Sequence, residues 1–167
     1  MKPFIVGVTA ALLAASSAFA VPAAPTANEI RLCTAKQDES PDIRIANCTA
    51  VIEKSRNKKQ KADAYVERAK AHHAKGNADG AISDFDEAIK LDPKNSETYF
   101  NRGLAFRDHG DADRAAQDLD QAVKLGNRNA GGLDTLSHLY YDRHDYEHAI
   151  TTLNTAIKLN GNNALAF

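Results

Sequence analysis

Residues 76–92 read GNADGAISDFDEAIKLD, and residues 110–126 read GDADRAAQDLDQAVKLG. When the two stretches are aligned from their first glycines, nine of the seventeen positions are identical. In the first stretch Ala81, Phe85 and Ala88 fall at i, i+4 and i+7, a spacing that places them on one face of a helix. The repeated stretch therefore predicts a helix with a packing stripe of small, large and small side chains.

The same stripe continues along the chain in the same register. It recurs at Ala115, Leu119 and Ala122, and again at Ala149, Leu153 and Ala156. Each stripe follows another helical pattern, in which a large, a small and a large residue occupy i, i+4 and i+7. These positions hold Tyr65, Ala69 and His72, then Tyr99, Gly103 and Phe106, then Leu133, Ser137 and Tyr140. The sequence therefore predicts three helix–turn–helix units of equal length.

Turn residues separate the two helices of each unit. They are Gly76-Asn77, Gly110-Asp111 and His144-Asp145. Glycine suits the left-handed residue that ends a helix, and Asn or Asp then caps the next helix. We expect His144 to adopt positive φ in place of glycine. One hairpin cannot bury its own stripe, so the units are expected to stack on one another.

These residues resemble the tetratricopeptide repeat, whose pattern is aromatic, small, aromatic in the first helix and small, aromatic, small in the second, with a closing proline. The matching segments are residues 62–95, 96–129 and 130–163. Pro93 closes the first, whereas Asn127 and Gly161 stand at that position in the others. The resemblance implies an all-α, right-handed α-solenoid. It also implies a protein that binds partner peptides or proteins on a concave face lined by the first helices.

The N-terminal residues 1–20, MKPFIVGVTAALLAASSAFA, have one lysine, an apolar run and a final Ala-Phe-Ala. This pattern predicts a signal peptide, followed by a flexible leader at residues 21–27. The protein is therefore expected in the bacterial periplasm or outside the cell, with no membrane span after cleavage. Retention of residues 1–20 as an anchor is the alternative, although the apolar run is short for a membrane span.

Residues 28–61 resemble the repeat less closely and are expected to form a divergent helical hairpin. It would cover the open N-terminal end of the stack, which repeat arrays need. An exported protein meets oxidising surroundings, so Cys33 and Cys48 are interpreted as a disulfide pair. A redox or metal role is the alternative, but a Cys-x-x-Cys motif and a set of four zinc ligands are missing.

Composition and motifs argue against several classes of function. The net charge is −1, so no strong field attracts nucleic acid, and the basic run at 54–61 is expected to be a solvated connection. Phosphate-binding, zinc-protease and nucleophile-elbow motifs are missing, so we expect neither an enzyme nor a cofactor. Aspartates that recur with the unit are interpreted as surface charge; they are Asp84, Asp86, Asp118 and Asp120.

The resemblance also nominates partner-binding residues on the first helices. They are Val66, Lys70, His73, Phe100, Asn101, Leu104, Arg107, His138 and Tyr141. Phe100 and Leu104 are apolar but lie off the packing stripe, so they indicate either a partner site or positions that the superhelix half covers.

Asn101 occupies one position of the clamp with which some family members hold a partner's terminal carboxylate. The clamp residues are not matched at Val66, Lys70, Gly131 and Thr135. Recognition of chaperone C-termini is therefore not expected.

A different class of function remains open in the third repeat. His138, His144 and His148 lie within eleven residues, which suggests a small metal- or ligand-binding protein. Convergence of the three side chains is not implied by their spacing, because His144 falls in a turn and His148 begins the next helix. We therefore assign no metal ligand and keep metal binding as the alternative to a protein-interaction module.

Residues 164–167, ALAF, begin an incomplete fourth repeat. Apolar side chains of the third repeat would then be left uncovered at the end of the stack. Either Leu165 and Phe167 fold back onto that repeat, or two chains pack end to end as a homodimer around a two-fold axis. The second arrangement is favoured slightly, because four terminal residues cover little surface.

Overall fold

The computed structural model describes residues 23–35 and 40–160, and within these ranges helices joined by short turns are the only regular secondary structure, with no strand. The predicted signal peptide and the start of the fourth repeat lie outside the described residues. The helices are α1 (Ala27–Thr34), α2 (Pro41–Lys54), α3 (Lys58–Ala74), α4 (Ala78–Leu91), α5 (Ser96–His109), α6 (Ala112–Lys124), α7 (Ala130–Asp142) and α8 (Tyr146–Asn160).

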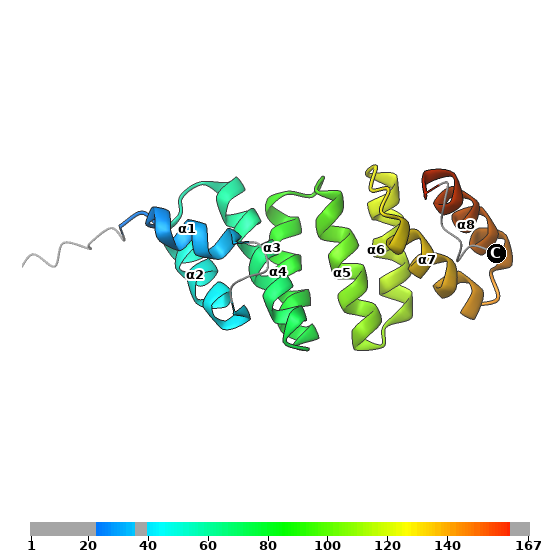
Figure 1. The fold of residues 1–167 in the computed structure, drawn as a ribbon, viewed down its shortest axis with the longest axis horizontal. Coiled ribbons are helices and arrows are strands. Elements are labelled where there is room, and N and C mark those ends of the chain that lie inside the picture. The colour runs from blue at the N-terminus through cyan, green and yellow to red at the C-terminus, as the bar shows by residue number, and fades with distance from the viewer. Residues whose placement is uncertain (1–22, 36–39, 161–167) are drawn as a thin grey trace, which may run out of the picture.

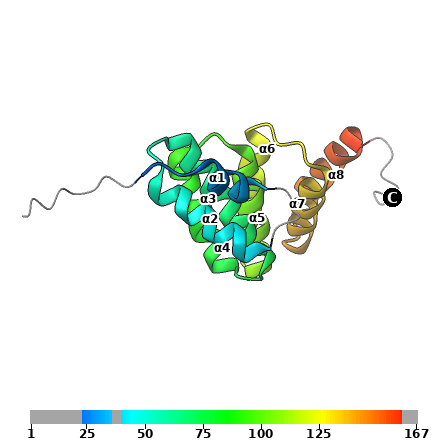
Figure 2. The same ribbon diagram turned by 60° about the vertical axis from the view of Figure 1, so that its left-hand side comes forward.

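Consecutive helices pair into four hairpins that stand in a row, with α1 and α8 at opposite ends (Figure 1). The view turned by 60° shows the same order (Figure 2). Each helix packs mainly against its neighbours in sequence, and α5 also contacts α3. This arrangement confirms the predicted all-α solenoid of helix-turn-helix repeats.

The turns within the repeats have the predicted chemistry. Gly76 and Gly110 have φ of 75° and 90°, and His144 adopts φ of 62° as expected. The side chains of Asn77 and Asp111 accept hydrogen bonds from the backbone N–H groups of Gly80 and Arg114, at the starts of α4 and α6. Residues local to each turn therefore satisfy the backbone groups at these helix ends.

The predicted stripe forms the core of the stack. Phe85 and Leu119, its large members, are only 1% and 2% exposed. Ala105 of α5 belongs to the cluster around Phe85, and Leu136 of α7 to the cluster around Leu119. The cores of the first two repeats are therefore each completed by the first helix of the repeat that follows.

The expectation that the recurring aspartates are surface charge is wrong for Asp84 and Asp118. Their exposed fractions are 5% and 6%. Arg68 donates two hydrogen bonds to the Asp84 carboxylate, at 2.8 and 2.7 Å. The sequence pattern does not reveal this pair, because the arginine lies on the other helix of the hairpin.

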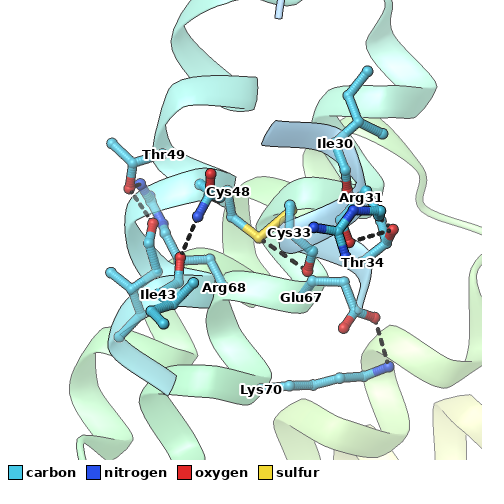
Figure 3. Close-up of a disulfide and its surroundings, with 12 residues drawn as sticks. Ile30, Arg31, Cys33, Thr34, Ile43, Cys48, Thr49, Glu67, Arg68 and Lys70 are labelled. Atoms are coloured by element: carbon cyan, nitrogen blue, oxygen red, sulfur yellow. Dashed lines mark hydrogen bonds and ion pairs between the residues drawn. A yellow bond between two sulfur atoms is a disulfide. The ribbon is translucent and has the colours of Figure 1, made fainter. Parts of the chain in front are cut away.

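The N-terminal hairpin is formed by α1 and α2 and closed by the predicted disulfide (Figure 3). The Cα atoms of Cys33 and Cys48 lie 4.6 Å apart, and both side chains are buried. They pack with Val51 and Ile52, and with Ala64 of α3, so the hairpin covers the first repeat.

Two boundaries of this region differ from the prediction. Helix α3 begins at Lys58, so residues 58–61 form its first turn and only residues 55–57 separate it from α2. The cap of Asn57, whose side chain accepts a hydrogen bond from Gln60 N–H, explains this early start. Helix α1 begins at Ala27, inside the predicted leader, because the Thr26 side chain and Glu29 form a capping box.

Candidate partner-binding surface

Ion pairs between neighbouring repeats tie together the first helices α3 and α5. Lys70 Nζ of α3 lies 2.7 Å from a carboxylate oxygen of Glu97 on α5. Closer to the turns, His73 Nε2 lies 2.7 Å from Asp108 Oδ2. Burial raises the pKa of Asp108, but hydrogen bonds from Arg107 and His73 outweigh it and hold that pKa below its usual value. Two of the nominated residues, Lys70 and His73, therefore already have partners within the chain.

A groove of about 310 Å³ lies between α5 and α7 on this side of the molecule. Its lining residues are Arg107, Asp134, Thr135, His138, Leu139 and Asp142. Leu139 is buried and forms an apolar floor, whereas Arg107, His138 and the two aspartates are exposed. Two nominated residues, Arg107 of α5 and His138 of α7, thus lie on opposite walls of one groove. The groove as a whole contains basic and acidic side chains.

The nominated apolar residues are less available than the sequence suggests. Val66 is only 8% exposed and belongs to the core cluster of the first repeat, so it offers almost no surface to a partner. Phe100 is half-buried against α7, where Gly132 has no side chain to obstruct the ring. Leu104 is also half-buried. Of the two interpretations of Phe100 and Leu104, partial coverage by neighbouring repeats is therefore the one that describes both residues.

Asn101 is half-buried and its Nδ2 donates a hydrogen bond of 2.8 Å to the backbone oxygen of Glu97. Tyr141, in contrast, is 62% exposed. The exposed part of the nominated set is therefore concentrated in the second and third repeats, around Arg107, His138 and Tyr141.

A second, more apolar groove of about 350 Å³ separates α7 from α8. It is lined by Asp134, Ser137, His138, Tyr141, Ala149, Ile150 and Leu153. Ile150 is 61% exposed and is not among the nominated residues. The sequence gives little sign that Ile150 is exposed. It occupies the same repeat position as Ile82, next to the first stripe residue, and the following helix partly covers Ile82.

The three histidines of the third repeat do not converge. His144 Nδ1 lies 2.9 Å from the hydroxyl of Tyr146, and His148 Nδ1 lies 2.8 Å from Asp145 Oδ2. The hydrogen bond that His148 makes to Asp145 raises the pKa of His148. No cluster of three or more His, Cys, Asp or Glu side chains with metal-binding geometry occurs in residues 23–35 and 40–160. The geometry therefore gives the metal-binding alternative no support.

Among the placed helices, none combines the length and the apolar character that crossing a membrane requires.

Comparison with known families gives consistent matches over the repeat region. A model described as TPR repeat matches residues 69–110. A model described as Tetratricopeptide repeat matches residues 96–127 and 131–163. No curated protein matches the chain.

Solved structures share the fold at low sequence identity. MamA has a TM-score of 0.66 at 17% identity, covering 74% of this chain and 71% of its own. The TPR domain of Arabidopsis OM64 has a TM-score of 0.61 at 23% identity, covering 66% and 91%. The first TPR of Spaghetti (RPAP3), bound to the HSP90 peptide SRMEEVD, has a TM-score of 0.60 at 23% identity, covering 65% and 86%.

Proposed function

The chain belongs to the tetratricopeptide repeat family, and we propose that it is a non-enzymatic scaffold that binds a partner peptide or protein on the face of its first helices. The observation that carries this proposal is the groove between α5 and α7. It is open, has a buried leucine at its floor and has charged side chains along both walls. An extended polypeptide could place an apolar side chain on the floor and its backbone along the polar walls.

The groove also limits the chemistry of the partner. Arg107 lies on one wall, and Asp134 and Asp142 lie on the other side, so a partner with both charge signs fits better than a uniformly acidic one. The peptide in the Spaghetti (RPAP3) structure, SRMEEVD, is largely acidic. Because this chain does not match the carboxylate clamp, we propose a different class of ligand for it.

We further propose that the protein works in the bacterial periplasm or is secreted. Residues 1–20 have the pattern of a signal peptide, and the Cys33–Cys48 disulfide is consistent with an oxidising compartment. The mass of the protein recovered from the cell envelope tests this directly. A mature chain that begins at Val21 is expected, and recovery of the full-length chain with reduced thiols from the cytoplasm would contradict the proposal.

Capture from envelope extract tests the binding proposal. The mature chain, immobilised through its N-terminus, is compared with the Arg107→Glu and His138→Glu variants. Both substitutions alter exposed groove walls, so we expect them to lower the yield of the same captured protein about tenfold without changing the melting temperature.

Gln117→Glu is the matched control, because Gln117 is an exposed residue of the second helix α6, outside the groove. This variant should capture the partner as the parent chain does. Equal capture by all four proteins, or loss of capture in the Gln117→Glu variant alone, would contradict binding by the first helices.

A further inference from the structure

Basic residues at the ends of first helices lie beside acids at the starts of the preceding second helices. The ion pairs are Lys75–Asp42, His109–Asp79 and Arg143–Asp113. The three basic residues occupy equivalent positions of successive repeats, as do Asp79 and Asp113. Every described first helix within the repeats therefore sets its C-terminal end beside the N-terminal end of the second helix before it.

The next acid in this register is Glu147, in the first turn of α8. It is exposed and makes no ion pair with any residue of the described part of the chain. A helix packed on α8 as α5 packs on α4 would run antiparallel to α8 and would place a cation of its last turn beside Glu147. Within the described residues, no helix follows α8 to fill this place.

Helix α8 itself has the features that such a neighbour needs. Its last turn contains one cation, Lys158, which is exposed and also lacks a described ion-pair partner. An apolar row runs along one face with alternating spacings of four and three residues, as in one strand of a coiled-coil seam. The row consists of Tyr146, Ile150, Leu153 and Ile157. Tyr146 and Ile150 are 50% and 61% exposed, whereas Leu153 and Ile157 are half-buried, so the described chain leaves the N-terminal half of the row uncovered.

We propose that the chain forms a homodimer in which α8 packs antiparallel to α8 of a second copy, closing the groove between α7 and α8. The pairing is self-complementary. With the two-fold axis between Thr152 and Leu153, Glu147 of each copy faces Lys158 of the other. The same register sets Ile150 beside Leu153 and Tyr146 near Ile157 across the seam. The interface is thus isologous and closes without generating a filament.

This surface is centred on α8 and differs from the partner groove between α5 and α7, although Asp134 and His138 of α7 line both grooves. Arg107 and Thr135 line only the partner groove, so changes at these two residues test partner binding separately from dimerisation.

Sedimentation equilibrium of the mature chain tests the proposal. We expect a dimer that Ile150→Asp converts to a monomer. Glu147→Lys and Lys158→Glu should each raise the dimer dissociation constant about tenfold, because each reversal places like charges at two symmetric contacts. The double variant Glu147→Lys/Lys158→Glu should restore the parent constant.

Lys124→Glu is the matched control, because Lys124 is exposed and occupies the position in α6 that Lys158 occupies in α8. It should leave the dissociation constant unchanged. A monomer at all concentrations would contradict the proposal, as would a dimer that persists in Ile150→Asp or charge reversals that the double variant does not rescue. Dimerisation only after deletion of residues 164–167 would show that this segment occupies the groove, which also overturns it.

Discussion

Arg102 of α5 holds Asp118 of α6 in a two-point contact, with Nε 2.6 Å from one carboxylate oxygen and Nη2 2.8 Å from the other. Its Nη1 reaches Asp86 of the preceding repeat at 2.6 Å. One guanidinium therefore joins the two helices of its own repeat and the repeat before. Burial lowers the pKa of Arg102, but the hydrogen bonds to both carboxylates outweigh this effect and raise it.

Removal of either partner of this pair should be costly. Arg102→Leu leaves the buried Asp118 carboxylate without its cation, and we expect it to lower the free energy of unfolding by about 3–5 kcal/mol in urea denaturation. The third repeat has an uncharged pair at these positions, where Leu136 and Thr152 stand. The double variant Arg102→Leu/Asp118→Thr should therefore be clearly more stable than the sum of the two single changes indicates.

The coupling is the quantity to measure, because each single variant also removes packing. Ser83→Thr, an exposed change on α4 away from the pair, serves as the control and should leave the unfolding free energy nearly unchanged. Strictly additive effects of the Arg102 and Asp118 changes would show that the pair does not act as one unit.

Two adjacent glycines of α7 should respond in opposite ways to alanine. A Cβ added at Gly132 would lie 2.7 Å from Phe100 Cδ2, so Gly132→Ala should cost about 1–3 kcal/mol by overpacking. A Cβ at Gly131 would meet only the side chain of Asn129 at 3.3 Å, so Gly131→Ala should be neutral or stabilise the helix by up to about 1 kcal/mol. Thermal unfolding distinguishes them.

The destabilisation expected for Gly132→Ala comes from a clash with the Phe100 ring. Phe100→Ala should therefore make Gly132→Ala nearly harmless when the two are combined, although Phe100→Ala alone lowers stability. Equal melting temperatures for Gly131→Ala and Gly132→Ala would refute the close approach of α5 and α7.

The disulfide should stabilise the N-terminal hairpin more than the rest of the solenoid. The bond joins residues 15 apart in the sequence. Replacing Cys33 and Cys48 by alanine should lower the free energy of unfolding by about 3 kcal/mol. Hydrogen exchange should then rise first in α1 and α2, while α5 and α6 keep their protection. Two titratable thiols in the native protein would rule out the bond.

Glu29 should give the N-terminal hairpin a measurable pH dependence. A hydrogen bond from Lys54, at 2.5 Å, lowers the pKa of Glu29 from 4.5 to about 2. Because the folded pKa is the lower one, the stabilisation is complete above about pH 4.5 and disappears as the pH falls through about 2. Glu29→Gln should therefore lower the melting temperature at pH 7, and its difference from the parent should shrink steadily over this range.

Glu53→Gln provides the comparison, because Glu53 is an exposed carboxylate of α2 that makes no ion pair with a described residue. Its melting temperature should follow that of the parent at every pH. A constant difference between Glu29→Gln and the parent from pH 7 to 2 would contradict the assigned pKa.

Much of the fold can be predicted because its determinants are local and periodic. The stripe around Phe85, the turn at Gly76 and the cap at Asn77 are each specified within one hairpin and then repeated. The Arg68–Asp84 pair cannot be predicted in this way, because a charged residue next to the stripe looks solvated until the facing helix supplies its partner. The same reason explains the wrong interpretation of Asp118.

The candidate site is less predictable, because exposure depends on neighbouring repeats. Val66 is nominated by its helix position, but packing within the first repeat buries it. Phe100 does lie off the stripe, yet its coverage depends on the absence of a side chain at Gly132, in the repeat that follows. Arg107 and His138 stay exposed because they lie on the walls of a groove. That groove exists only because α5 and α7 are spaced apart in the folded chain.

The central claim is that a polypeptide partner binds on the face of the first helices. Photo-crosslinking in cells tests it most directly, with the photoreactive residue p-benzoylphenylalanine replacing Thr135 in the α5–α7 groove or Gln117 on α6. Irradiation should join one and the same protein to the chain labelled at position 135, in amounts that Arg107→Glu reduces. A crosslink to that protein from position 117, with none from position 135, would contradict the account.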